Sequence, residues 1–60
     1  MTRTYALHRL LEHGPLTKRE MGEITGWTAH SVWHAIEDLM VRGVVTSSGL
    51  RRSRVYSLAD

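Results

Sequence analysis

Residues 16–28 read Leu-Thr-Lys-Arg-Glu-Met-Gly-Glu-Ile-Thr-Gly-Trp-Thr, and this stretch decides the fold. Thr17 and Glu20 have the spacing of a capping box, which marks the start of a helix. In a capping box the Thr hydroxyl accepts a hydrogen bond from the backbone N–H three residues on, and the Glu carboxylate reaches back to the Thr N–H. A helix is therefore predicted to begin at Lys18.

The same stretch predicts that this helix is short. Thr25-Gly26 stops it after about two turns, since glycine suits the left-handed position after a helix. Met21 and Ile24 are expected to be its apolar contacts. Gly22 costs about 1 kcal/mol relative to alanine inside a helix, so we expect it to permit close approach of another helix.

A longer helix is predicted to follow, with Trp27 in the turn before it. Thr28 caps it, and it runs through Arg42 to stop at Gly43. At about 100° per residue, one face carries the apolar residues Val32, Ala35, Ile36 and Leu39. The opposite face carries His30 and His34, with Ser31 and Trp33 on the two shoulders. This face pattern indicates an amphipathic helix packed on a core.

The flanking segments complete the predicted architecture. A first helix spans about Thr4 to His13 and ends at Gly14-Pro15. After Gly43 the β-branched run 44–47, a turn at Ser48-Gly49 and a returning strand over 53–58 predict a hairpin. The order helix, helix, helix, hairpin predicts an α+β fold, mostly α, formed by a single domain over residues 1–60.

Composition narrows the function classes. The chain has no cysteine, which excludes disulfides and thiolate metal sites, and no apolar run approaches a membrane span. The N-terminus lacks the hydrophobic stretch of a signal peptide, and we expect a cytoplasmic protein.

Positive charge is concentrated near the C-terminus. The net charge is only +2, but Arg51, Arg52 and Arg54 lie within four consecutive positions, and no acid lies between Asp38 and Asp60. Such segregation can create a local positive patch on a nearly neutral protein.

These residues together resemble a known family. The run 16–28 is similar to the first half of a helix-turn-helix unit, and 31–45 continues it with the core positions of a recognition helix and the entry to a wing strand. The closing run 52–58 is similar to the second wing strand of winged-helix regulators from bacteria and phages. The resemblance covers roughly residues 5–58 and implies a three-helix winged helix-turn-helix with a C-terminal two-stranded β-hairpin wing. Gly22 and Trp27 depart from the usual small alanine and aliphatic residue.

The resemblance implies double-stranded DNA as the partner. In this family the N-terminal part of the recognition helix reads base edges in the major groove; here that part offers Thr28, His30, Ser31, Trp33 and His34. The wing residues Arg51, Arg52 and Arg54 are expected on phosphates or in the minor groove, and Thr17 with Lys18 forms a second phosphate site at a helix start. Glu37 and Asp38 would repel phosphate and limit contact to the first two turns. The implied role is a small transcriptional regulator or a recombination or replication accessory factor that binds as a dimer or in adjacent copies.

Other interpretations of these residues stay open. His30 and His34 have the spacing of a helical metal site, or are solvated polar residues. Trp33 can contact DNA, lie at the rim of the core, or join a protein interface. The arginines can form an ordinary solvated patch. A winged helix can also serve as a protein–protein module, here through a face made of Trp33, Met40 and Val41. We expect no catalysis, since no phosphate loop or metalloprotease motif is present, and no cofactor, metal or small-molecule ligand.

Overall fold

Threonine side chains cap the start of each of the three α-helices found in residues 2–59. A computed structural model describes residues 2–59. Helix α1 spans Arg3–Leu11, α2 spans Lys18–Thr25 and α3 spans Ala29–Val41. Their N-caps are Thr2, Thr17 and Thr28, and each hydroxyl accepts from a backbone N–H three residues on. The predicted bounds of α2 and α3 are confirmed to within one residue, and α1 begins one residue earlier and ends two residues earlier than predicted.

The capping box at the start of α2 is present in full. Glu20 N donates to Thr17 Oγ1 at 3.1 Å, and Thr17 N donates to Glu20 Oε1 at 2.9 Å. The helix ends at Gly26, whose φ of 76° is left-handed and costs little only for glycine. The predicted stop at Thr25-Gly26 is confirmed.

An antiparallel hairpin follows the helices. Strand β1 spans Val45–Ser48 and pairs with β2, Val55–Leu58, in the register Val45 to Leu58 and Ser48 to Val55. Between them Arg51–Ser53 form a short 3₁₀ turn, η1. The returning strand therefore begins two residues later than predicted, because Ser53 donates its N–H back to the Leu50 carbonyl instead of joining the ladder.

The hairpin is attached to the chain between α1 and α2. Leu16 N donates to Tyr56 O at 3.1 Å, and Tyr56 N donates to Leu16 O at 2.8 Å. Leu16 thus adds a single antiparallel bridge to the free edge of β2.

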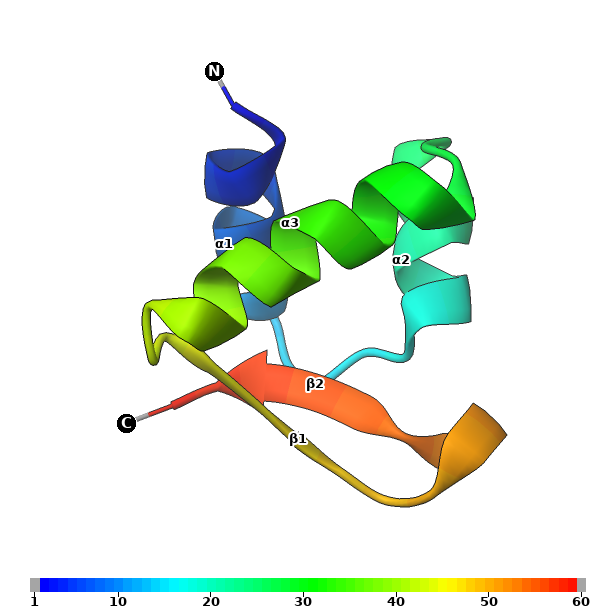
Figure 1. The fold of residues 1–60 in the computed structure, drawn as a ribbon. Helices are drawn as coiled ribbons and strands as arrows, with labels where there is room; N and C mark the ends of the chain where they lie inside the picture. Colours follow the sequence, from blue (N-terminus) through cyan, green and yellow to red (C-terminus); the bar gives the residue numbers. More distant parts are fainter. Residues whose placement is uncertain (1, 60) are drawn as a thin grey trace.

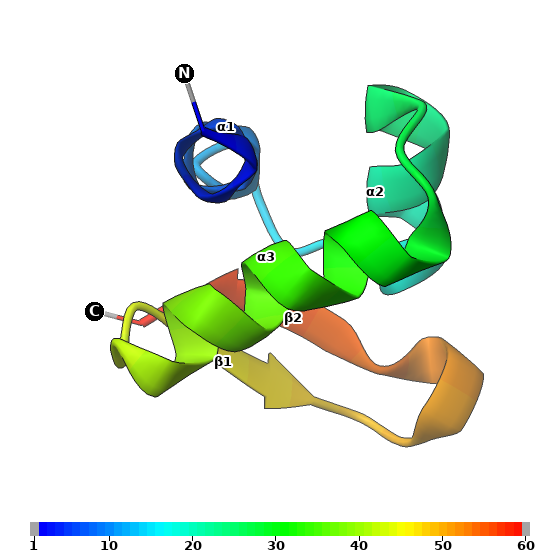
Figure 2. The same cartoon turned by 45° about the horizontal axis from the view of Figure 1, so that its top comes forward.

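The core lies between the three helices and the hairpin. Figures 1 and 2 show α1 and α2 on one side of α3, with the hairpin running along its other side. All four predicted core residues of α3 are buried, and the completely enclosed side chains are Leu7, Met21, Val32 and Ile36. Leu10, Leu16 and Trp27 are partly buried against this cluster. Within residues 2–59, every buried side-chain N or O atom has a hydrogen-bond partner.

Two predictions about α2 are wrong. Ile24 is 59% exposed and takes no part in the core, because the helix buries a single residue, Met21. Gly22 does not allow another helix to approach: a Cβ built there would meet only the Trp27 carbonyl oxygen, at an ordinary 3.8 Å. The helix that packs on α2 approaches through other positions.

The helices of residues 2–59 are all too short, or too polar, to cross a lipid bilayer.

Candidate nucleic-acid interface

The first half of α3 presents its polar residues in pairs. Thr28 Oγ1 accepts from Ser31 N at 3.2 Å and lies 3.1 Å from Ser31 Oγ, to which it donates. Thr28 is exposed and Ser31 is half-buried. The Ser31 hydroxyl keeps its own proton for an outside acceptor, so this cap still offers one hydroxyl donor at the helix surface.

His30 and His34 form the second pair. Both are exposed, their Nε2 atoms lie 2.9 Å apart, and the rings meet edge to face with centroids 4.3 Å apart. One Nε2 must donate and the other must accept, so one of the two rings carries no proton on its Nε2. While the pair is formed, outward hydrogen bonding falls to the Nδ1 atoms. Within residues 2–59 no third His, Asp or Glu joins them in a group able to hold a metal ion.

Trp33 pairs with Lys18 across two helices. The Lys18 Nζ lies 5.0 Å from the centroid of the Trp33 ring, within cation–π range. Trp33 is 39% exposed, so the indole is neither a core residue nor freely presented. This contact places a cation from the start of α2 directly beside the exposed side of α3.

The start of α2 has less anion-binding capacity than the sequence suggested. The capping box occupies the N–H groups of Thr17 and Glu20, and it holds the Glu20 carboxylate at the helix start. Thr17 itself is half-buried. The attraction for phosphate at this point therefore comes chiefly from the Lys18 ammonium.

The hairpin tip carries the densest positive charge. Arg51, Arg52 and Arg54 are all exposed. The ion pairs among residues 2–59 lie elsewhere, on α1 and at the end of α3. With no carboxylate beside them in this part of the chain, the three guanidinium groups can bind external anions, and their forked donors match phosphate oxygens well.

The hairpin tip and the first turns of α3 lie at the same end of the molecule. In Figures 1 and 2, the tip (orange) extends toward the end where α2 and the start of α3 (green) are found. The tip that carries the three arginines, the helix α2 that begins at Lys18, and the start of α3 therefore lie toward the same end of the molecule. No hydrogen bond joins the tip to α3 in the described residues, so the tip projects as a separate contact element.

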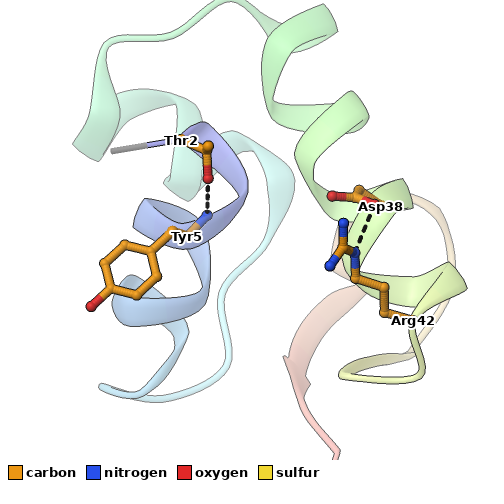
Figure 3. A network of polar contacts seen from close by, with 4 residues as sticks. All are labelled: Thr2, Tyr5, Asp38 and Arg42. Carbon is orange, nitrogen blue, oxygen red and sulfur yellow. Dashed lines mark hydrogen bonds and ion pairs between the residues drawn. The ribbon is translucent and has the colours of Figure 1, made fainter.

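The far end of α3 is electrostatically different. Arg42 Nε donates to Asp38 Oδ1 at 3.0 Å (Figure 3). This hydrogen bond lowers the pKa of Asp38 below its ordinary value, and the Thr4 hydroxyl adds to the effect. Asp38 is thus ionised but paired, which leaves the exposed Glu37 as the acid that would repel phosphate here.

Sequence reasoning missed Arg3 and Leu50. Arg3 packs its guanidinium 5.9 Å from the Trp27 ring centroid. It also lines an open groove of about 450 Å³ between α1 and α3, together with His30, Ser31 and His34. Only the tertiary packing of α1 beside α3 brings it there, and no local pattern signals that. Leu50, 76% exposed at the hairpin tip, could have been noticed as an apolar residue directly before two arginines.

No protein-family model, no curated protein and no solved structure matches this chain. The interpretation of the site depends on its own residues.

Proposed function

We propose that this protein is a double-stranded DNA-binding domain of the winged helix-turn-helix type. In this proposal α3 enters the major groove with its first two turns, and the hairpin tip contacts phosphates or the adjacent minor groove. The observation that carries the proposal is the grouping of three unpaired arginines with Lys18 and the polar start of α3 at one end of the molecule.

The contacts divide into two kinds. Arginine and lysine contacts to phosphate supply affinity and fix orientation, whereas side chains on the helix read base edges. The Ser31 hydroxyl, the histidine Nδ1 atoms and the exposed edge of Trp33 are the groups available for reading. We propose that the protein is a small transcriptional regulator or an accessory factor in recombination or replication. It binds DNA as a dimer or in adjacent copies, because linking two modest interfaces raises the overall affinity strongly.

Charge reversal at the hairpin tip tests the proposal. An NMR titration of labelled protein with mixed-sequence duplex DNA should shift amides in 28–34 and 48–54 together. Roughly three to five phosphate contacts predict a slope of about −3 to −4.5 for log K against log salt. Arg52→Glu should weaken binding and flatten this slope.

Arg9→Glu is the matched control, since it changes net charge equally on α1, where Arg9 pairs with Glu12 at 3.4 Å. If both variants lose affinity equally, the hairpin has no special part in binding. If wild-type protein shifts neither segment even at low salt, the DNA-binding proposal is wrong.

The alternative protein-binding face is less well supported. Trp33 and Met40 are seven residues apart and share one side of α3, but Val41 lies about 100° further round. Val41 is nevertheless 82% exposed, the highest value among the large apolar residues of 2–59. A partner protein that protects Val41 and Met40 in place of the hairpin would favour this second function.

A further inference from the structure

The hairpin tip presents one apolar side chain among cations. Leu50 is 76% exposed and precedes Arg51 and Arg52, with Arg54 close behind. No acidic residue occurs in 39–59. An exposed leucine alone is ordinary on a protein surface, but its position at the apex of an arginine-rich turn is not explained by packing.

The tip is held in one shape by its backbone. The Leu50 carbonyl accepts both from Ser53 N at 3.0 Å and from Ser53 Oγ at 2.8 Å. Gly49 has a φ of 90°, and a Cβ there would lie 2.8 Å from the Ser53 carbonyl oxygen. Arg51 has a φ of 52°, a left-handed conformation that is strained for arginine. These hydrogen bonds and positive φ angles define the backbone of the turn, and they leave the Leu50 side chain exposed on it.

We propose that Leu50 is a wedge that inserts between neighbouring base pairs from the minor groove and kinks the duplex, with the arginines bound to the flanking phosphates. This inference rests on the proposed DNA-binding function. Apolar wedges, leucine among them, partly unstack a base step and bend DNA by about 20–90°. The minor groove is about 6 Å wide, so a narrow turn with one projecting side chain fits it better than a helix does.

A single wedge suits a duplex better than a lipid bilayer. One leucine buries too little apolar area to hold a protein on a membrane surface, where binding scales with the whole apolar face of a helix. Between two base pairs, the same side chain is enclosed on both sides by aromatic faces, and its neighbours meet phosphates on both strands. The chemistry of the tip therefore points to the bent duplex.

The test compares two variants of similar size at one position. Leu50→Met keeps an apolar wedge, and Leu50→Gln replaces it with a polar side chain of nearly the same length. Ile24→Gln makes the same kind of change at an exposed apolar residue of α2. Bending is measured by energy transfer between fluorophores at the two ends of a mixed-sequence duplex of roughly 25 base pairs. Unstacking is followed by 2-aminopurine placed at central TA steps, with each duplex saturated by protein.

Wild type, Leu50→Met and Ile24→Gln should all shorten the end-to-end distance and raise the 2-aminopurine fluorescence. Leu50→Gln should bind with no more than about a tenfold loss of affinity, because the phosphate contacts remain, and should leave the DNA straight. Equal bending by Leu50→Gln, or a straight duplex in the wild-type complex, would overturn the wedge while leaving DNA binding in place. No binding of wild-type protein at low salt would overturn both proposals. Binding to phosphatidylserine vesicles that Leu50→Gln abolishes, with no DNA bending, would assign Leu50 to a membrane instead.

Discussion

The helical body and the hairpin tip obtain their shapes by different means. Of the nine buried residues in the described range 2–59, seven belong to the helices, the other two are Val45 and Tyr56 on the strands, and none lies in 49–54. The body is fixed by burial of apolar surface. The tip is fixed by glycine geometry, by a strained arginine and by hydrogen bonds to the Leu50 carbonyl. The body should therefore be sensitive to substitutions that remove buried apolar side chains. The tip should be sensitive to substitutions that change its glycines or its backbone hydrogen bonds.

The largest effect should come from a core residue with an exposed counterpart. Ile36→Ala removes a completely buried side chain of α3 and should lower the free energy of unfolding by about 2–5 kcal/mol. That is about half of the roughly 3–9 kcal/mol expected for a 60-residue domain. Ile24→Ala removes the same atoms from the surface of α2 and should change it by less than about 0.5 kcal/mol. Urea unfolding followed by circular dichroism measures both, and equal losses would contradict the assignment of the core.

Alanine substitutions of two glycines test whether the tip has a fixed backbone conformation; Gly49 lies in the tip and Gly26, at the end of α2, is the control. Gly49→Ala places a Cβ against the Ser53 carbonyl oxygen at 2.8 Å in addition to the strain of its positive φ, and should cost about 2–3 kcal/mol locally. Gly26→Ala, with φ 76° and nothing within 4 Å, should cost only about 1–2 kcal/mol. Amide chemical shifts in 48–54 should change only in the first variant. Unchanged tip shifts in Gly49→Ala would mean that the turn is not rigid.

Gly22→Ala should stabilise the body. The added Cβ meets only the Trp27 carbonyl oxygen at 3.8 Å, and alanine is favoured in a helix interior by about 0.5–1 kcal/mol. The melting temperature should rise by a few degrees, roughly 4–8 °C per kcal/mol for a domain of this size. The DNA binding proposed above should be the same in this variant. A fall in the melting temperature would show that α2 is more tightly packed at this position than the distance implies.

The smallest effect concerns pH and the end of α3. The folded state lowers the pKa of Asp38 through Arg42, so the pair contributes stability above the unfolded value of about 3.8. That contribution is lost as pH falls through the lower folded value. Asp38→Asn should slightly lower the melting temperature at about pH 7, and this difference should shrink as the pH falls below the unfolded value of about 3.8 and the wild-type carboxyl takes up its proton. A difference that persists in acid would point to packing instead of charge.

Local signals in the sequence were enough to place the helices. Thr17 with Glu20, Thr28 and Gly26 each act on the backbone within four residues, so their effects are readable from spacing alone. The exposure of His30 and His34 follows from the same arithmetic, as does their contact one turn apart. The predicted start of β2 was two residues too early, because the turn at Arg51–Ser53 is formed by hydrogen bonds that residue types alone do not predict.

Contacts between elements were beyond sequence reasoning. The Lys18–Trp33 pair joins α2 to α3, and Arg3 reaches the groove beside His34 only because α1 packs there. Ile24 has the helical spacing of a core residue, yet the short α2 buries only one side chain. Periodicity indicates which face of a helix is apolar, but not how much of that face a partner covers.

The Leu16–Tyr56 bridge has a consequence for hydrogen exchange. Both amides of the bridge are bonded, and the Tyr56 side chain is only 2% exposed. Exchange at Leu16 and Tyr56 should therefore require global unfolding, whereas amides of 49–54 exchange through local opening. Exchange at the tip and at the base of the hairpin would then measure two different things. A ligand that contacts only the tip should slow exchange of the amides in 49–54. Slower exchange at Leu16 would instead measure how much binding stabilises the whole domain.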